Sequence, residues 1–168
     1  MAKSLSSELG EITSPSRSLL FLLRDGQVLL ARKKTGFGRG KIVGIGGTAE
    51  DGEDIVQTAI RETVEETGVL PLDPKRVGSL SFFFPTRDTS WNMRAWVFTA
   101  LKWKGQPVES DEVEPIWFDL DRIPFDEMWS DARFWLPQVL SGKSLEGHFI
   151  FDDTLAVSWY RVEEAGFS

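Results

Sequence analysis

Hydrophobic residues gather in short runs along most of the chain, separated by glycine, proline and acidic residues. Two such runs, residues 17–23 and 27–33, flank Asp25-Gly26, a dipeptide typical of tight turns, and they predict a β-hairpin. Two later runs joined by a polar loop predict a second strand pair, and the last two runs predict a closing hairpin. The further strands are expected over residues 76–85, 92–103, 114–120, 147–153 and 156–164.

Two segments carry the apolar spacing of amphipathic helices. The first extends from about residue 54 to residue 67, and Gly68 is suited to cap its C-terminus because glycine tolerates a left-handed backbone. The second covers residues 131–142, where Pro137 predicts a break or a new start. Strands interspersed with two helices predict an α+β or α/β fold with a mixed sheet.

The length of 168 residues suits one domain with a sizeable core. We expect that domain over residues 17–168, preceded by a polar, serine-rich tail that is disordered over residues 1–16. The chain contains no cysteine, which excludes disulfides and thiolate metal sites and favours a reducing compartment. A single histidine, His148, excludes a histidine-rich metal site.

The formal net charge is -7 at pH 7, whereas proteins that bind nucleic acid polymers usually present a basic surface. The N-terminal residues lack the apolar stretch of a signal peptide, and no segment approaches the ~18 apolar residues typical of a membrane span. We therefore expect a cytoplasmic protein that binds neither membranes nor nucleic acid polymers. No apolar helix or strand edge demands a second chain, so we expect a monomer.

The first helix concentrates carboxylates beside its apolar side. At about 100° per residue, the apolar stripe consists of Ile55, Val56, Ala59, Ile60 and Thr63. Glu62, Glu65 and Glu66 fall at the edge of this stripe, near the helix end whose dipole disfavours anions. A solvated acidic face is one interpretation. However, these carboxylates repel one another, and no lysine or arginine lies between Glu62 and Lys75 to relieve the repulsion, which indicates a missing metal ion. Oxygen ligands alone suit Mg2+ or Mn2+, and Mg2+ commonly shares its shell with substrate phosphates.

The same region carries a resemblance to the Nudix family. The spacing of the Nudix box is reproduced by Gly47, Glu53, Arg61, Glu62, Glu65, Glu66, Gly68 and Val69. Thr63 stands where an aliphatic residue is usual. The segments KKTGFGRGK, PVESDE, WFDLDRIPFDEMW and GHFIFDD resemble the MutT-like branch, in particular the animal oxidised-purine nucleoside triphosphatases. The resemblance extends from about residue 18 to residue 162 and implies a Nudix fold, a mixed sheet sandwiched between helices.

Members of this branch hydrolyse nucleoside triphosphates to monophosphate and pyrophosphate with Mg2+, for which Mn2+ can substitute. The resemblance therefore implies a small-molecule nucleotide as the partner and Mg2+ as the cofactor. The implied metal ligands are the backbone carbonyl of Gly46 and the side chains of Glu62, Glu65, Glu66 and Glu112. The implied catalytic residues are Glu53, Arg61, Glu62 and Glu112. In this set Arg61 braces Glu53, and either Glu62 or Glu112 serves as the general base.

The resemblance also implies a substrate pocket on the other side of the metal. Lys33 is expected to contact the substrate and Phe37 to line the base pocket. Trp129 offers a stacking face for a purine, and Asp131 can hydrogen-bond a base edge. Phe82 and Met93 are further candidates for the pocket wall. The full set of predicted substrate-binding residues is Lys33, Phe37, Val43, Gly46, Gly47, Trp129 and Asp131.

Two positions depart from the animal enzymes. Val43 replaces an asparagine and Ala132 replaces a second aspartate, and both of those polar residues contact the base in the animal proteins. The loss of two base-reading groups puts the preferred base in question without affecting the metal or phosphate chemistry. Two alternatives stay open: hydrolysis of another nucleoside diphosphate derivative such as ADP-ribose, and a non-catalytic nucleotide-sensing module. The second alternative fits less well because all glutamates of the box are present.

Overall fold

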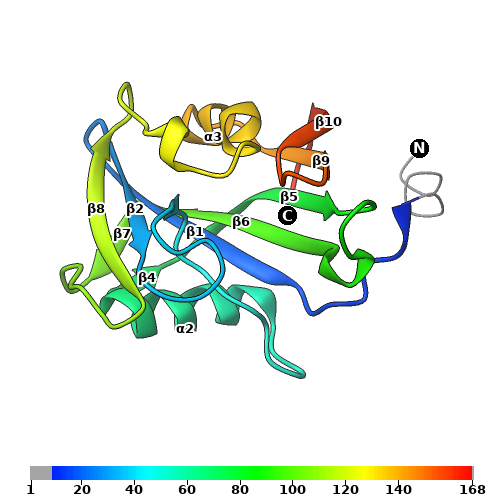
Figure 1. Cartoon of the computed structure of the whole chain (residues 1–168). Coiled ribbons are helices and arrows are strands. Elements are labelled where there is room, and N and C mark those ends of the chain that lie inside the picture. Colours follow the sequence, from blue (N-terminus) through cyan, green and yellow to red (C-terminus); the bar gives the residue numbers. More distant parts are fainter. Residues whose placement is uncertain (1–8, 168) are drawn as a thin grey trace.

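The computed structural model describes residues 9–167, and this part of the chain folds around an eight-stranded mixed sheet with two α-helices (Figure 1). Along the sheet the strands follow the order β10-β9-β5-β6-β1-β2-β3, and β8 also pairs with β2. Short strands β4 and β7 form a separate two-stranded sheet. The strands are β1 (Arg17–Arg24), β2 (Gln27–Lys33), β3 (Ile42–Val43), β4 (Leu70–Leu72), β5 (Lys75–Phe83), β6 (Met93–Ala100), β7 (Lys102–Lys104), β8 (Val113–Asp119), β9 (Leu145–Phe151) and β10 (Val157–Glu164).

The predicted hairpins and the mixed sheet are confirmed. β1 pairs antiparallel with β2, β5 with β6, and β9 with β10. Parallel pairing of β1 with β6 and of β5 with β9 makes the sheet mixed. The structure adds the short strands β3 and β4, and it separates β7 from β6, where the sequence predicted one continuous strand over residues 92–103. These pieces have only two or three residues, too few for a two-residue periodicity to show in the sequence.

Helix α2 (Ile55–Thr67) matches the first predicted helix, and local interactions fix both of its ends. The Asp54 side chain accepts a hydrogen bond from the Val56 amide at 2.9 Å, and the Gln57 side chain completes a capping box. Gly68 ends the helix with φ 77°, a left-handed conformation that favours glycine. The caps explain why a helix with so many carboxylates begins and ends where the sequence predicts.

The buried side of α2 differs in part from the predicted stripe. Ala59 and Thr63 are buried as expected, whereas Ile60 is only half-buried. Threonines take its place: Thr63 and Thr67 are fully buried and donate their hydroxyls to backbone carbonyls one turn earlier, both at 2.7 Å. Burial of these hydroxyls costs little because each has a hydrogen-bond partner. Glu66 is also buried, as its overlap with the apolar stripe predicted.

Helix α3 (Ala132–Leu140) corrects the prediction made at Pro137, because the helix continues through this residue. Proline lacks the amide that would bond the carbonyl of Arg133, four residues earlier. Arg133 is exposed, so water can satisfy its carbonyl. The helix is short, and the deep burial of Trp135 and Leu136 fixes it to the sheet.

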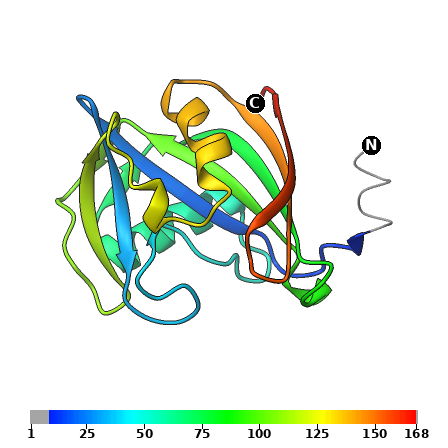
Figure 2. The ribbon, with the colours of Figure 1, turned by 45° about the horizontal axis from the view of Figure 1, so that its top comes forward.

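The two helices cover opposite faces of the sheet (Figures 1 and 2). On one face, α3 packs on a core that contains Phe21, Leu30 and Phe149. On the other face, α2 packs on a core that contains Leu20, Leu22 and Phe98. Successive residues of β1 thus serve the two cores alternately, as side chains of a strand must. This is the α+β architecture that the sequence predicted.

A buried asparagine, Asn92, holds the segment that precedes β1 in place by hydrogen bonds. Asn92 donates its side-chain amide to the carbonyls of Leu9 at 3.1 Å and Glu11 at 3.3 Å, and its backbone carbonyl accepts the Ser14 hydroxyl at 2.7 Å. Residues 9–16 therefore differ from the disordered tail expected over residues 1–16, because Asn92 offers them specific partners. Residues 1–8 of that tail lie outside the described residues. Neither α2 nor α3, within residues 9–167, has the length and apolar content that a membrane crossing requires.

Candidate active site

A cavity of about 570 Å³ opens where the loop before α2 meets the segment before α3. It is formed by residues from both faces of the sheet, which are far apart in the sequence. Most of the predicted site residues line it: Lys33, Phe37, Val43, Gly46, Gly47, Arg61, Glu62, Glu66, Glu112, Trp129 and Asp131. Two predicted residues, Glu53 and Glu65, are not among the lining residues. The structure thus brings the α2 carboxylates and the predicted base-binding residues to one cavity.

Two glycines let the loop before α2 approach its neighbours closely. A Cβ atom on Gly46 would lie 1.7 Å from the Ser18 carbonyl oxygen of β1. A Cβ atom on Gly47 would lie 2.3 Å from the carboxyl carbon of Glu62. Both distances are far below van der Waals contact. The backbone of Ser18 cannot move away, so only glycine fits at position 46, whereas a larger residue at position 47 would have to displace the Glu62 carboxylate. Gly47 therefore leaves the space in which the Glu62 carboxylate sits.

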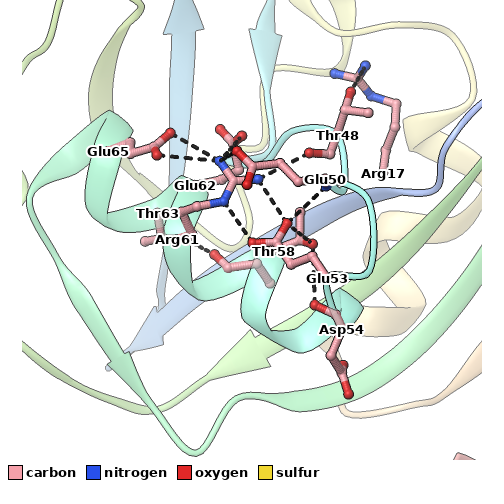
Figure 3. A network of polar contacts seen from close by, with 11 residues as sticks. Arg17, Thr48, Glu50, Glu53, Asp54, Thr58, Arg61, Glu62, Thr63 and Glu65 are labelled. Atoms are coloured by element: carbon pink, nitrogen blue, oxygen red, sulfur yellow. Dashed lines mark hydrogen bonds and ion pairs between the residues drawn. The ribbon is translucent and has the colours of Figure 1, made fainter.

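Arg61 connects the carboxylates at the start of the site (Figure 3). Its Nε donates to Glu53 Oε2 at 2.8 Å, and its Nη1 donates to Glu62 Oε1 at 3.0 Å. Nη1 also lies 3.3 Å from Glu65 Oε2, and Nη2 donates to the carbonyl of Thr48 at 3.2 Å. The predicted contact between Arg61 and Glu53 is confirmed. One guanidinium thus positions three glutamates and the loop.

The Glu53 carboxylate holds Arg61 in place by hydrogen bonds and does not line the cavity. Hydrogen bonds from Arg61, and then from the Thr58 hydroxyl at 2.7 Å, lower the pKa of Glu53 to about 2. The same contact with Glu53 raises the pKa of Arg61. Both side chains therefore stay charged over the whole physiological pH range, and the pair can hold its geometry during a reaction.

Glu66 is the most deeply placed carboxylate of the cluster. Its residue is 6% exposed, and burial, followed by the charges of Glu62 and Glu112, raises the pKa of Glu66 to about 8. A hydrogen bond with Glu62 contributes in the same direction, and the positive charge of Lys33 opposes it. In the absence of a cation, the Glu66 carboxyl group thus keeps its proton at neutral pH.

The carboxylates of the site are chemically suitable ligands for a divalent metal, although their side chains are not arranged around a common point. Within residues 9–167, no group of three or more acidic, histidine or cysteine side chains is arranged so that it could hold a metal ion. Figure 3 shows that Glu65 turns toward Arg61, which also binds Glu62. A hard cation would replace the proton that Glu66 holds, and the exposed Glu65 can turn without disturbing the core.

Trp129, the residue predicted to stack on a purine, is one of the aromatic residues that line the cavity. Its ring stacks on Phe37 with centroids 5.3 Å apart and an interplanar angle of 15°. The Lys41 ammonium lies 4.5 Å from the centre of the Trp129 ring, and Gly38 leaves room for the indole, since a Cβ there would approach it to 3.0 Å. Phe37 itself is 62% exposed. A flat indole with an exposed aromatic neighbour suits a purine, which stacks on such groups.

Asp131 is a buried carboxylate in the same part of the cavity. Its Oδ2 accepts a hydrogen bond from the Trp135 indole at 2.8 Å, which orients the carboxyl group. Burial raises the pKa of Asp131 to about 6, and the Trp135 bond opposes that shift. Val43 and Ala132 also line the cavity, so the two positions that depart from the animal enzymes face the space next to Asp131.

Several lining residues were not identified from the sequence. They include Arg17, Ser18, Thr35, Phe84, Met128, Trp135, Phe151 and Leu155. Two-residue periodicity could have found Phe84, because Phe82 was a candidate and side chains two positions apart face the same side of a strand. Arg17 gave no such signal, because its place in the cavity depends on the parallel pairing of β1 with β6, which brings together distant segments.

Comparisons with known proteins agree with this geometry. The family model described as NUDIX domain matches residues 13–139. The proteins named oxidized purine nucleoside triphosphate hydrolase from Danio rerio and Mus musculus are each 38% identical over 152 residues, covering 90% of this chain and 96% of each relative. The crystal structure of a MutT protein from Bacillus halodurans is 26% identical with a TM-score of 0.77, covering 88% of this chain and 97% of that chain. The chain belongs to the Nudix family and is a MutT-like Nudix hydrolase.

Proposed function

We propose that the protein is a Mg2+-dependent pyrophosphohydrolase that cleaves oxidised purine nucleoside triphosphates to the monophosphate and pyrophosphate. The observation that carries this proposal is the single cavity that holds both a carboxylate cluster and an aromatic wall. The relatives at 38% identity, named for hydrolysis of oxidised purine nucleoside triphosphates, support the substrate class. A nucleoside triphosphate has the two chemical parts that these walls complement: charged phosphates and a planar base.

The metal ligands in this proposal are Glu62, Glu65, Glu66, Glu112 and the carbonyl of Gly46. Magnesium bound there, or manganese in its place, would neutralise phosphate charge and lower the pKa of a coordinated water. Arg61 keeps Glu62 at a fixed position beside Gly47, so that a carboxylate faces the phosphates. Lys33 adds positive charge from the cavity wall.

The general base in this proposal is Glu62 or Glu112, both of which line the cavity. Glu62 accepts a hydrogen bond from Arg61, which holds its carboxylate in place. Glu112 is exposed on the loop before β8 and has no ion pair among the described residues, so it is free to approach a water. These surroundings favour Glu112 for proton removal and Glu62 for positioning.

Trp129 and Phe37 are the proposed stacking residues for the purine. Asp131 reads the base edge: as a carboxylate it accepts hydrogen bonds, and when protonated it also donates one. Because Val43 and Ala132 offer no side-chain hydrogen bond, Asp131 is the main polar group for base recognition in this region. Selection of the oxidised base therefore depends on fewer polar contacts than in the animal enzymes.

The test is hydrolysis of a panel of normal and oxidised purine nucleoside triphosphates and of ADP-ribose, with Mg2+, with Mn2+ and with EDTA. We expect turnover of purine nucleoside triphosphates in either metal, loss of turnover in EDTA, and release of a monophosphate and pyrophosphate. Glu66→Gln is expected to lower kcat by orders of magnitude. A dominant nucleoside diphosphate product, a clear preference for ADP-ribose, or full activity in EDTA would contradict the proposal.

A further inference from the structure

Arg17, the first residue of β1, is a positively charged residue of the cavity lining that was not predicted from the sequence. It is half-buried and lines the cavity together with Gly47 and Lys33. Its Nη1 donates a hydrogen bond to the Thr48 hydroxyl at 3.0 Å, as Figure 3 shows. Among the described residues it makes no ion pair within 4.0 Å, although the protein is acidic overall.

The other cations of the cavity differ in their surroundings. Arg61 is saturated by Glu53, Glu62 and Glu65, so it cannot serve an incoming anion without giving up those contacts. Lys33 makes no ion pair among the described residues, and the charge of Arg17 is near enough to lower the pKa of Lys33 after the larger effect of burial. The charges of Glu66 and Glu112 act on Lys33 in the opposite direction, but neither Lys33 nor Arg17 is in an ion pair within 4.0 Å among the described residues. The two cations therefore lie near each other at the cavity, and an anion bound between them would relieve their repulsion.

The chemistry of a guanidinium suggests which anion this is. Arginine has five N–H donors in a planar fork that matches two oxygens of a phosphate, and the Thr48 contact uses one of them. Thr48 follows Gly47 directly in the loop before α2, so its hydroxyl fixes the fork beside the proposed metal site. The arrangement is pre-organised for a polyphosphate rather than for a base, which would be recognised by Trp129 and Asp131.

We propose that Arg17 is a specificity-determining residue that, together with Lys33, binds the phosphates of the substrate beyond the one attached to the sugar. The inference rests on the proposed function and deepens it. Because this contact needs a phosphate beyond the first, Arg17 favours binding of triphosphates. Monophosphates, and diphosphates whose terminal phosphate is esterified, are expected to bind less tightly. The same contact retains the pyrophosphate until it leaves the site.

The test compares Arg17→Met with Arg17→Lys, and uses Arg24→Met as a matched control. Arg24 lies at the other end of β1, where its guanidinium stacks 3.7 Å from the centre of the Trp117 ring, away from the cavity lining. Calorimetry in Mg2+ measures the Kd of inorganic tripolyphosphate and of 8-oxo-dGMP for each protein. Steady-state kinetics measures KM and kcat for 8-oxo-dGTP and for any nucleotide that the natural protein hydrolyses faster.

We expect Arg17→Met to weaken tripolyphosphate binding and to raise KM for the triphosphate by about tenfold or more, since a charge-assisted contact is lost. The Kd of 8-oxo-dGMP and kcat are expected to change by less than about threefold. Arg17→Lys is expected to recover part of the loss, because it restores the charge but not the fork. Arg24→Met is expected to leave all four quantities within about twofold.

Equal weakening of 8-oxo-dGMP and tripolyphosphate by Arg17→Met would overturn the inference and assign Arg17 to the sugar or to loop structure. Unchanged binding of both ligands would also overturn it. If the natural protein hydrolyses no nucleoside triphosphate, the proposed function fails, whereas the tripolyphosphate comparison still decides the role of Arg17. The two failures are therefore distinguishable.

Discussion

Glu66→Gln is expected to stabilise the metal-free protein, although it removes a proposed metal ligand. Glu66 is buried on α2 and lies close to Glu62 and Glu112, so ionisation of its carboxyl group is opposed both by burial and by like charges. Glutamine has nearly the same shape and can still donate a hydrogen bond to Glu62, but it never becomes charged. The substitution therefore removes the cost of ionisation and keeps most of the packing.

The magnitude follows from the pKa of Glu66, which is about 8 in the folded protein against an ordinary value of 4.5. Below pH 4.5 the group is protonated in both states. As the pH rises from 4.5 to 8, the unfolded chain releases the proton while the folded protein keeps it, so the free energy of unfolding falls by about 1.4 kcal/mol per pH unit. The ceiling is about 5 kcal/mol, and we expect about 2 kcal/mol to be realised because Glu62 and Glu112 share the repulsion.

The assay is urea unfolding at pH 5, 6, 7 and 8 in EDTA, followed by the same series in Mg2+. The free energy of unfolding of Glu66→Gln should nearly equal that of the natural protein at pH 5 and exceed it by about 2 kcal/mol at pH 8. Mg2+ should reverse the order, since the cation stabilises only an ionised cluster. Glu65→Gln is the control in EDTA, because Glu65 is exposed and should show no such rise. A Glu66→Gln protein that is less stable at pH 8 in EDTA, or a difference independent of pH, would refute the reasoning.

Three further substitutions test other parts of the site. Gly47→Ala should lower kcat by about 100-fold or more with a small change in Tm, because the added methyl group displaces Glu62; near-normal kcat would contradict the packing argument. Trp129→Ala should raise KM for nucleotides by about tenfold while the protein stays folded at room temperature, and an unchanged KM would remove Trp129 from base binding. Val43→Asn/Ala132→Asp should raise the ratio of kcat/KM for 8-oxo-dGTP over dGTP; an unchanged ratio would place selectivity in other groups.

The sequence predicted most of the fold because local signals and the final structure agree. The turn at Asp25-Gly26, the cap at Asp54 and the left-handed Gly68 all act within a few residues. The helix containing Pro137 was predicted less well, because burial of Trp135 and neighbouring side chains outweighs the local preference for a break. The short strands β3, β4 and β7 arise from pairing with distant segments, which local patterns do not contain.

The candidate site was predictable where a motif fixes spacing, and much less so elsewhere. Glu62 and Glu66 were found from their spacing alone, and the resemblance added Lys33 and Trp129. Arg17 could not be found in this way, because its position in the cavity depends on sheet topology. The contact of Glu65 with Arg61 was not predicted, although the two residues are four positions apart on one helix, a spacing that indicates an ion pair.

Helix α2, which carries Glu62 and Glu66, and the segment from Trp129 that leads into α3 lie on opposite faces of one sheet (Figure 1), and they are separated by more than sixty positions in the chain. Substitutions in the segment around Trp129 can therefore accumulate without shifting the helix that holds Glu62 and Glu66. In the proposed function, base selectivity and hydrolysis depend on separate segments of one fold, so a mutation can change one without changing the other. Exchange of residues 129–135 between relatives is accordingly a route to enzymes with new base preferences and unaltered bond cleavage.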